Sequence, residues 1–373
     1  MRWKTYFGLG LAGLALLGVV AWPVDSADAA ADLPRGDVEL ASVGALALGP
    51  DNILFVGDSD AARVVALEVE IPEAAADYET IEDLDGKIAA MLGIGARDVY
   101  VKDMVVHQPS GTVFLSVMRG DGDDALPVLL RVARDGTIGE VALEGVRYST
   151  LALGDAPAEG EKLYRWSARS LSITDLEYID GELYVAGLSN EEFASTLRRA
   201  AFPFGDAPVS TGLEIYHGAH GAWETHAPIF SFIPYEIAGD RHLLAGYLCT
   251  PLVTFPLDEV RSKDRLRGKT IAELGWGNIP TDLVDYEHEG ERYLLIANSS
   301  RGTMKLKAAD IVAAQAREGI TSEAGPREGV DYHTAPLGSV AQIAMFDDEH
   351  ILVLTRSMEN GALSLAIRSK DWV

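Results

Sequence analysis

The sequence predicts an all-β protein: a six-bladed β-propeller with short helical insertions, its ring closed by an N-terminal strand. Residues 172–189, SITDLEYIDGELYVAGLS, show the underlying pattern most clearly. Two apolar runs flank Asp180-Gly181, which suits a tight turn because glycine accepts positive φ. The pattern recurs six times, and repeats of short strands at near-constant spacing are typical of propeller blades. A sandwich or two smaller sheets stay open as alternatives.

The six hairpins differ in what surrounds them. Their spacing exceeds the ~40 to 50 residues usual for blades, so insertions are expected. The last copy has room for only three strands. The strand at 37–42 is predicted to complete it, because an open ring would leave unpaired edges. The copies begin near residues 44, 103, 175, 233, 282 and 342, and helices are expected at 85–92, 190–200 and 308–318, the last stopped by Gly319.

The N-terminus reads as an export signal. Arg2 and Lys4 precede an apolar run, and Ala27-Asp28-Ala29 offers a cleavage site. We therefore expect a signal peptide at 1–29, one propeller domain at 30–373 and a periplasmic or secreted protein. An uncleaved membrane anchor is the alternative, since the run approaches spanning length. Cys249 is the only cysteine, so no internal disulfide can form.

The composition is strongly acidic. The chain has 31 Lys and Arg against 57 Asp and Glu, a formal net charge of −26. Such a charge repels nucleic acid and anionic lipid, so we expect neither as a partner. A solvated acidic surface explains the charge more simply than an acidic docking face.

Two copies carry a family resemblance: VGALALGPDNILFVGDS and PTDLVDYEHEGERYLLIANSS. In its repeat pattern the chain, over roughly residues 40–370, resembles the NHL-repeat and gluconolactonase/strictosidine-synthase-like six-bladed propellers. That superfamily includes calcium-dependent lactonases and arylesterases as well as pure binding scaffolds. The resemblance therefore implies a fold and leaves the function open.

Three aspartates occupy the same repeat position, in VKDM, ITDL and PTDL: Asp103, Asp175 and Asp282. Carboxylates aimed at one axis repel one another, and a divalent cation such as Ca²⁺ would relieve the repulsion. The resemblance implies a metal held by Asp and Asn around the axis, for which Asn278 and Asn298 are further candidates. Alternatively, each aspartate accepts backbone N–H bonds at its strand.

The segment HGAHGAWETH supplies candidate catalytic residues. His226, which follows Glu224 by two residues, could act as general base toward a metal-bound water. Alternatively, His226 could bind a transition metal together with His217, His220 and Cys249, although the histidine spacing matches no zinc signature. A structural loop histidine and a buried, inert cysteine are the simpler interpretations.

Other residues are expected at the mouth of the channel, where innermost strands start and second strands end. Gln342, Arg301 and Arg356 are predicted to bind a small-molecule ligand there. The expected helix at 190–200 would either cover the mouth, bringing Arg198 and Arg199 to an anionic ligand, or pack at the side. Tyr164-Arg165-Trp166 could stack on a ligand.

Motifs that would name a reaction are missing from the sequence. It has no Gly-x-Ser-x-Gly elbow, Walker loop, dinucleotide fingerprint or haem-attachment motif. The first functional hypothesis is calcium-assisted hydrolysis of a lactone or ester. A non-catalytic propeller that binds a ligand or protein, and an accessory protein of an envelope redox system, are the alternatives.

Overall fold

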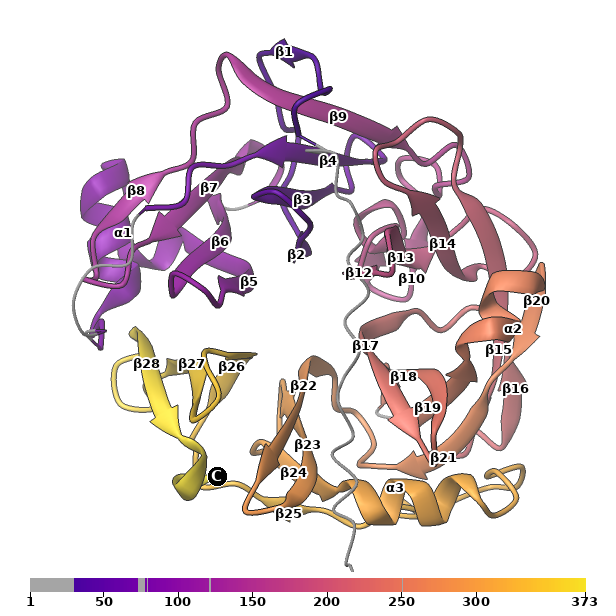
Figure 1. Ribbon diagram of the computed structural model, residues 1–373. Helices are drawn as coiled ribbons and strands as arrows, with labels where there is room; N and C mark the ends of the chain where they lie inside the picture. Colours follow the sequence, from indigo (N-terminus) through magenta and orange to yellow (C-terminus); the bar gives the residue numbers. More distant parts are fainter. Residues whose placement is uncertain (1–29, 73–77, 79, 121, 250) are drawn as a thin grey trace, which may run out of the picture.

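Six sheets stand around a central channel, which confirms the six-bladed propeller (Figure 1). The structure is a computed structural model that describes residues 30–373 except 73–77, 79, 121 and 250. We call the sheets blades I to VI in the chain order of their innermost strands. Those strands are β2 (Leu46–Leu48), β5 (Val99–His107), β12 (Asp175–Ile179), β17 (Ile229–Ile237), β22 (Pro280–His288) and β26 (Val340–Met345).

The outer strands follow the predicted hairpins. Blade II adds β6 (Thr112–Arg119), β7 (Leu126–Val132) and β8 (Ile138–Glu140), and blade III adds β13 (Glu182–Leu188), β14 (Ser195–Ala201), β15 (Val209–His217) and β16 (Ala222–Glu224), with β20 (Arg265–Arg267) on β15. Blade IV adds β18 (Asp240–Tyr247), β19 (Pro251–Pro256) and β21 (Lys269–Glu273), and blade V adds β23 (Glu291–Asn298), β24 (Met304–Lys307) and β25 (His333–Thr334). Blade VI adds only β27 (His350–Arg356) and β28 (Leu363–Ser369).

Blade I is built from two separate parts of the chain. After β3 (Ile53–Asp58) and β4 (Arg63–Glu68), the chain leaves to form all of blade II, and it returns as β9 (Val146–Ala152), which pairs with β4. The innermost strands then contact one another in the ring order II, I, III, IV, V, VI and back to II (Figure 1). Blade I therefore lies between blades II and III.

The prediction that an N-terminal strand closes the ring is wrong. Residues 37–42 form no strand, and β1 (Arg35–Gly36) pairs with β9 of blade I. The segment packs beside blade I: the Val38 N–H donates to the carbonyl of Leu143, just before β9 (2.8 Å), and the Asp58 carboxylate of β3 accepts the Ser42 N–H (2.8 Å).

Blade VI instead closes against the segment that leads into blade II. Ile81 and Leu365 of β28 exchange two backbone hydrogen bonds of 2.9 Å. The Leu363 N–H donates to Asp85 Oδ1 (2.9 Å), at the start of helix α1 (Leu84–Leu92). The internal segment around Ile81 thus closes the ring in place of the predicted N-terminal strand.

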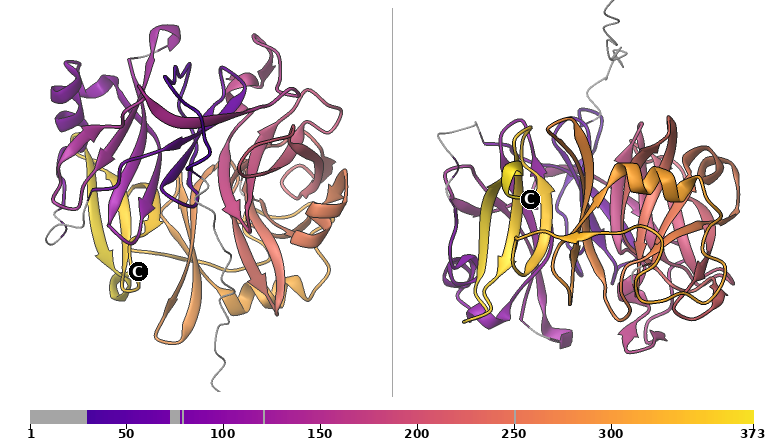
Figure 2. Two further views of the ribbon diagram at one scale, coloured as in Figure 1. Left: turned by 45° about the horizontal axis from the view of Figure 1, so that its top comes forward. Right: turned by 90° about the horizontal axis from the view of Figure 1, so that it is seen from below.

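Two of the three predicted helices are present. They are α1 and α3 (Ala308–Gln315), which ends before Gly319 and lies on the outside of the ring (Figures 1 and 2). The short helix α2 (Leu257–Ser262) follows β19 in blade IV. Smaller elements are β10 (Lys162–Leu163), β11 (Trp166–Ser167) and the 3₁₀ turns Ala96–Asp98, Gly122–Asp124, Arg169–Leu171 and Lys370–Trp372.

The helix predicted at 190–200 is wrong, because this segment contains the third strand of blade III, β14. Sheet pairing on both sides overrides its helix-forming residues. Arg198 is fully buried and is not available to a ligand. Its guanidinium donates to Asp155 (2.7 Å) and to the carbonyls of Ser172 (3.0 Å) and Leu188 (2.8 Å).

The core lies between neighbouring blades. All six residues of β3 are buried, and Phe55 meets Phe202 of blade III edge to face with ring centroids 5.0 Å apart. Burying one such side chain contributes about 1.5 to 3 kcal/mol. Apolar packing between blades therefore stabilises a fold in which no internal disulfide can form.

Candidate metal centre

The three repeated aspartates fasten blades together. In each, one carboxylate oxygen accepts the N–H of the next residue, and the other accepts an N–H from the neighbouring blade. The interblade donors are Leu46 to Asp103 (2.7 Å), Phe232 to Asp175 (2.7 Å) and Ile343 to Asp282 (3.0 Å). These bonds join blades II to I, III to IV and V to VI, so every second junction of the ring has one.

Glu177 lies in the channel with the three aspartates, and all four side chains are half-buried. Burial raises the pKa of Asp103 to about 7 and, with help from Asp103, that of Glu177 to about 8. Burial and the neighbouring carboxylates also raise the pKa values of Asp175 and Asp282. The channel therefore carries less negative charge than its composition suggests.

The predicted calcium ligands do not gather around one point. The described residues offer one group of three or more His, Cys, Asp or Glu whose ligand atoms lie within 4.8 Å of one another, and it contains none of the aspartates. Asn278 and Asn298 bond to each other, Nδ2 to Oδ1, at 2.7 Å. Calcium binding stays a prediction, and the geometry of these side chains fits the structural alternative better.

That one group consists of His217, His220 and Cys249. His217 ends β15 of blade III, His220 lies in the turn that follows, and Cys249 follows β18 of blade IV. The two imidazole rings have centroids 4.0 Å apart. Side chains from two blades thus meet where those blades adjoin.

Glu224 holds both histidines in place. His217 Nδ1 donates to Glu224 Oε2 (2.9 Å), and His220 Nδ1 donates to Oε1 (2.5 Å). An ionised carboxylate only accepts, so both Nδ1 atoms carry hydrogen, and a metal would bind through the Nε2 atoms, which for His217 requires loss of its second proton. His217 is 1% exposed, and besides Glu224 its side chain interacts with the Cys249 thiol.

The electrostatics couple these groups. Burial alone would lower the pKa of His217, but Cys249, Glu224 and Glu273 outweigh it and raise that pKa to about 9. Burial would raise the pKa of Glu224, but the two histidines lower it to about 2. A hydrogen bond with His217 lowers the pKa of the Cys249 thiol, against the effect of burial. The cysteine is therefore biased toward the thiolate, which is the form that binds metals.

Local backbone structure explains how the sequence builds this cluster. The turn after β15 lets β16 run back along it, so Glu224 pairs with Ile215 and faces the histidines. Gly218 leaves room for a buried carboxylate, since a Cβ there would lie 2.8 Å from Glu273 Oε1. The Gly218 N–H donates to that same oxygen (2.7 Å).

The predicted metal ligands Asn278 and Asn298 support the cysteine. The Cys249 N–H donates to the Asn278 carbonyl (2.9 Å), and Asn278 Oδ1 accepts from the N–H (3.1 Å) and hydroxyl (3.0 Å) of Ser300. Cys249 has φ of 65°, an unusual conformation for a residue other than glycine. The asparagine pair thus helps to fix a strained loop.

The sequence did not single out Glu273, at the end of β21. Its side chain is fully buried, and Oε2 has no hydrogen-bond partner among the described residues. Burial raises its pKa, while the histidines oppose that shift. An acidic residue inside the apolar run TIAELG was the available signal.

The remaining predicted residues lie apart from the cluster or in supporting roles. His226 is exposed, whereas its predicted partner Glu224 belongs to the cluster. Gln342 Nε2 donates to the Lys102 carbonyl (3.3 Å) in the channel, Arg301 donates to the Trp276 carbonyl (3.4 Å), and Arg356 donates to the Gly361 carbonyl (2.7 Å) in its own hairpin. Their ligand-binding roles stay predictions.

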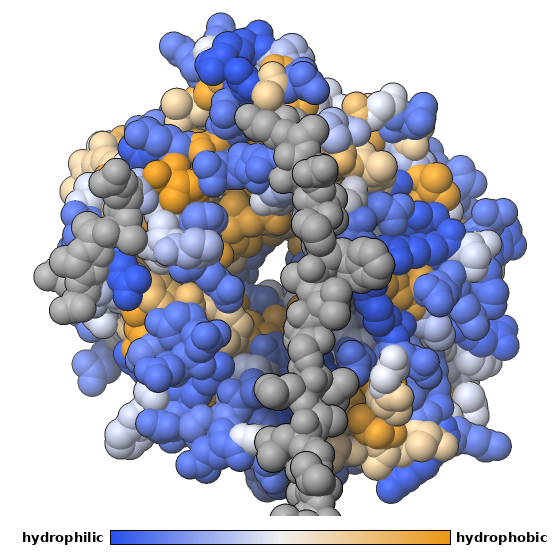
Figure 3. All heavy atoms as spheres, viewed as in Figure 1, coloured by the Kyte–Doolittle hydropathy of each residue, from blue (hydrophilic) through white to orange (hydrophobic). Residues whose placement is uncertain are grey.

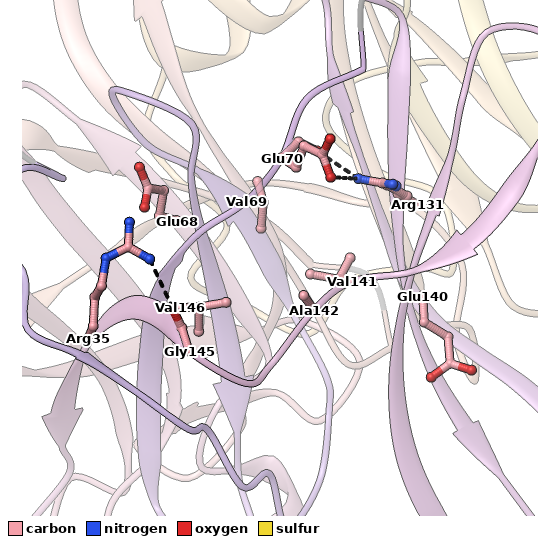
Figure 4. Close-up of a pocket in the computed structure, with 10 residues that line it drawn as sticks. All are labelled: Arg35, Glu68, Val69, Glu70, Arg131, Glu140, Val141, Ala142, Gly145 and Val146. Atoms are coloured by element: carbon pink, nitrogen blue, oxygen red, sulfur yellow. Dashed lines mark hydrogen bonds and ion pairs between the residues drawn. The ribbon is translucent and has the colours of Figure 1, made fainter.

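Two cavities lie elsewhere in the described part of the chain. The mouth holds one of about 290 Å³, whose lining includes Asp60, Lys102, Thr174 and Phe230. Another, of about 380 Å³, lies in blades I and II (Figure 4). There Arg131 pairs with Glu70 (2.9 Å) and Arg35 donates to the Gly145 carbonyl (3.0 Å), so its cations are engaged. Neither cavity gathers metal-binding groups as the cluster does.

No known protein family and no curated protein matches the chain. Similar solved structures include the extracellular domain of a protein described as a one component system from B. thetaiotaomicron (12% identity, TM-score 0.39), Drosophila Semaphorin 1b extracellular domains 1–2 (10%, 0.36) and the Plexin A4 extracellular region (9%, 0.43). Each likeness covers about nine tenths of this chain (90%, 90% and 91% in the same order). It covers 39% of the B. thetaiotaomicron chain, 86% of the Semaphorin chain and 40% of the Plexin chain. Likenesses this remote concern the fold alone.

Two further properties concern the surface of the protein and its helices. Hydrophilic residues cover most of the outer part of the face seen in Figure 3, whereas hydrophobic residues border part of the central opening. Within the described part of the chain, the helices are too short or too polar to cross a membrane.

Proposed function

We propose that the protein is an exported metal-binding propeller that holds a copper or zinc ion between blades III and IV. The observation that supports this most is the set of three ligand atoms within 4.8 Å on His217, His220 and Cys249. Two imidazoles and a thiolate suit copper and zinc, whereas calcium and magnesium prefer oxygen ligands.

Glu224 prepares the cluster for a metal. A carboxylate bonded to the far nitrogen of a metal-binding histidine fixes the ring and raises its basicity. Here one carboxylate does this for both histidines, at 2.9 and 2.5 Å. Little rearrangement is then required, which lowers the cost of binding.

The cluster offers three protein ligands, and such a site keeps a position open for a further ligand. Two histidines and one cysteine also form the donor set of electron-transfer copper sites. This donor set favours the accessory role in an envelope redox system as a second candidate function. Hydrolysis of a lactone or ester stays a prediction, which a substrate screen on Asp282→Ala and Cys249→Ser would test.

Metal titration of the reduced, metal-free protein tests the proposal. Cu(I), Cu(II) and Zn(II) are titrated against a chromophoric chelator, and bound metal is counted by mass spectrometry. We expect one ion per chain, lost in His217→Ala and Cys249→Ser. His226→Ala is the matched control, because this exposed histidine lies outside the cluster and should leave affinity unchanged.

The proposal would be overturned if wild type bound no ion with one-to-one stoichiometry. It would equally fail if His217→Ala and Cys249→Ser bound the ion as tightly as His226→Ala. A calcium titration of the same proteins addresses the channel aspartates separately.

A further inference from the structure

The cavity at the mouth of the channel is lined by residues of four consecutive blades. Its volume of about 290 Å³ is close to the lower limit of about 300 Å³ that is usual for small-molecule sites. The lining includes Asp60 between β3 and β4 of blade I, Lys102 in β5 of blade II, Thr174 just before β12 of blade III and Phe230 in β17 of blade IV. A single small ligand can therefore contact several blades at once.

Two opposite charges line this cavity without pairing with each other. Asp60 and Lys102 are both exposed, and neither side chain forms a hydrogen bond or an ion pair with another described residue. Burial and the Asp58 carboxylate raise the pKa of Asp60, and the charges of Arg169 and Lys102 offset this only in part. The Asp60 carboxylate would therefore be stabilised by a further cation close to it.

The backbone fixes the positions of these residues. Ser42 Oγ accepts the Asp60 N–H (3.1 Å). Lys102 and Phe230 are each the extra residue of a β-bulge, in β5 and in β17, and a bulge redirects its side chain out of the regular alternation of the strand. A site held by its backbone in this way is largely formed before a ligand arrives, which lowers the cost of binding.

Much of the remaining lining is apolar. Phe230 and Met118 line the cavity and are only half-buried, so they leave apolar surface uncovered. Trp166 packs edge to face against Phe230, with ring centroids 6.5 Å apart, and so restricts the movement of that ring. A ligand that matches the lining carries both a positive and a negative group together with an apolar body.

We propose that the mouth cavity binds a free amino acid with an apolar side chain. Lys102 pairs with the carboxylate of the ligand, Asp60 pairs with its ammonium group, and its side chain lies against Phe230. The cavity shares no residue with the metal cluster, so this inference does not depend on the proposed function.

Calorimetric titration of the full protein tests the proposal, with L-leucine and L-phenylalanine as probes. Two analogues of leucine each lack one charge: 4-methylpentanoate has no ammonium group, and 3-methylbutylamine has no carboxylate. We expect wild type to bind leucine at least about tenfold more tightly than either analogue, because each analogue loses one hydrogen-bonded charge pair. The same titrations with and without added Zn(II) should agree.

Two substitutions assign the charges. Lys102→Met should weaken binding of leucine and of 4-methylpentanoate about tenfold and leave binding of 3-methylbutylamine unchanged. Asp60→Asn should weaken binding of leucine and of 3-methylbutylamine and leave 4-methylpentanoate unchanged. Lys162→Met is the matched control, because this exposed lysine lies outside the cavity lining and should leave affinity for leucine unchanged.

Thermal unfolding of all three variants should match wild type, because each replaced side chain is exposed. The inference is wrong if wild type binds neither amino acid, or if it binds one of the singly charged analogues as tightly as leucine. Equal affinities of Lys102→Met and Lys162→Met for leucine would equally contradict it, since Lys102 would then not pair with the ligand.

Discussion

The channel and the junction of blades III and IV both gather charged side chains, but they use them differently. Asp103, Asp175 and Asp282 recur at one position of alternate blades, and backbone N–H groups engage both oxygens of each. The cluster around Glu224 occurs once, and its side chains contact one another across two blades. The aspartates that repeat with the fold thus join neighbouring blades, whereas the cluster that occurs once is the proposed metal site.

The largest effect should come from Cys249→Ser. Removing the only thiolate ligand should weaken copper or zinc binding by more than about a hundredfold, because replacing even a supporting group costs 10 to 100-fold. Competition with a chelator measures this loss. Asp103→Asn, on the channel, should bind metal as wild type does, and the contrast between the two regions fails if both variants lose affinity equally.

The next effect concerns the group that orients the histidines. Glu224→Gln keeps the shape of the side chain but leaves one oxygen to accept a hydrogen bond, since its amide nitrogen donates. One histidine then loses its fixed orientation, and metal affinity should fall about 10 to 100-fold. An unchanged affinity in the same chelator competition would remove Glu224 from the metal centre.

On the channel side, Asp175→Ala should destabilise the fold and spare the metal. The Phe232 N–H loses its acceptor, and an unsatisfied buried donor costs about 1 to 3 kcal/mol. Urea unfolding measures this cost. The exposed Asp206→Ala should change stability by less than about 0.5 kcal/mol, and equal stability of the two variants would argue against a fastening role.

The raised pKa values in the channel also predict a dependence of stability on pH. Asp103 and Glu177 have pKa values raised to about 7 and about 8, so between their unfolded and folded values the native state binds more protons. The free energy of unfolding should therefore fall as pH rises from about 5 to about 8.5. Glu177→Gln should flatten this fall, and an identical slope in urea unfolding would show that Glu177 is ionised in the native channel.

The sequence predicted what local pattern determines. Alternating apolar residues around tight turns indicated all six hairpins, and α1 and α3 were predicted from their residues. Long-range pairing had no local signal: β9 pairs with β4 of blade I across more than about 80 residues of sequence, and Ile81 takes the place of an N-terminal strand. The segment 195–201 has helix-forming residues, and only its two sheet neighbours make it a strand.

The candidate site was predictable in its parts and not in its assembly. His217, His220 and Cys249 were named as possible metal ligands, but their spacing matches no known signature because the cysteine comes from another blade. The repeated aspartates drew attention for the opposite reason: their pattern is regular. Glu273 carried only a weak signal, a single acid in an apolar strand.

The sequence of blade II is inserted between β4 and β9 of blade I, and this has a consequence for folding during synthesis on the ribosome. The outer edge of β4 stays unpaired until β9 (residues 146–152) has emerged from the ribosome. By then all of blade II has emerged as well. These two blades should consequently fold as one unit. Ile81 can pair with Leu365 only after β28 of blade VI has been synthesised, so the ring closes last. A ribosome-bound chain long enough for residue 152 to have left the exit tunnel should thus resist protease far better than one from which β9 has not yet emerged.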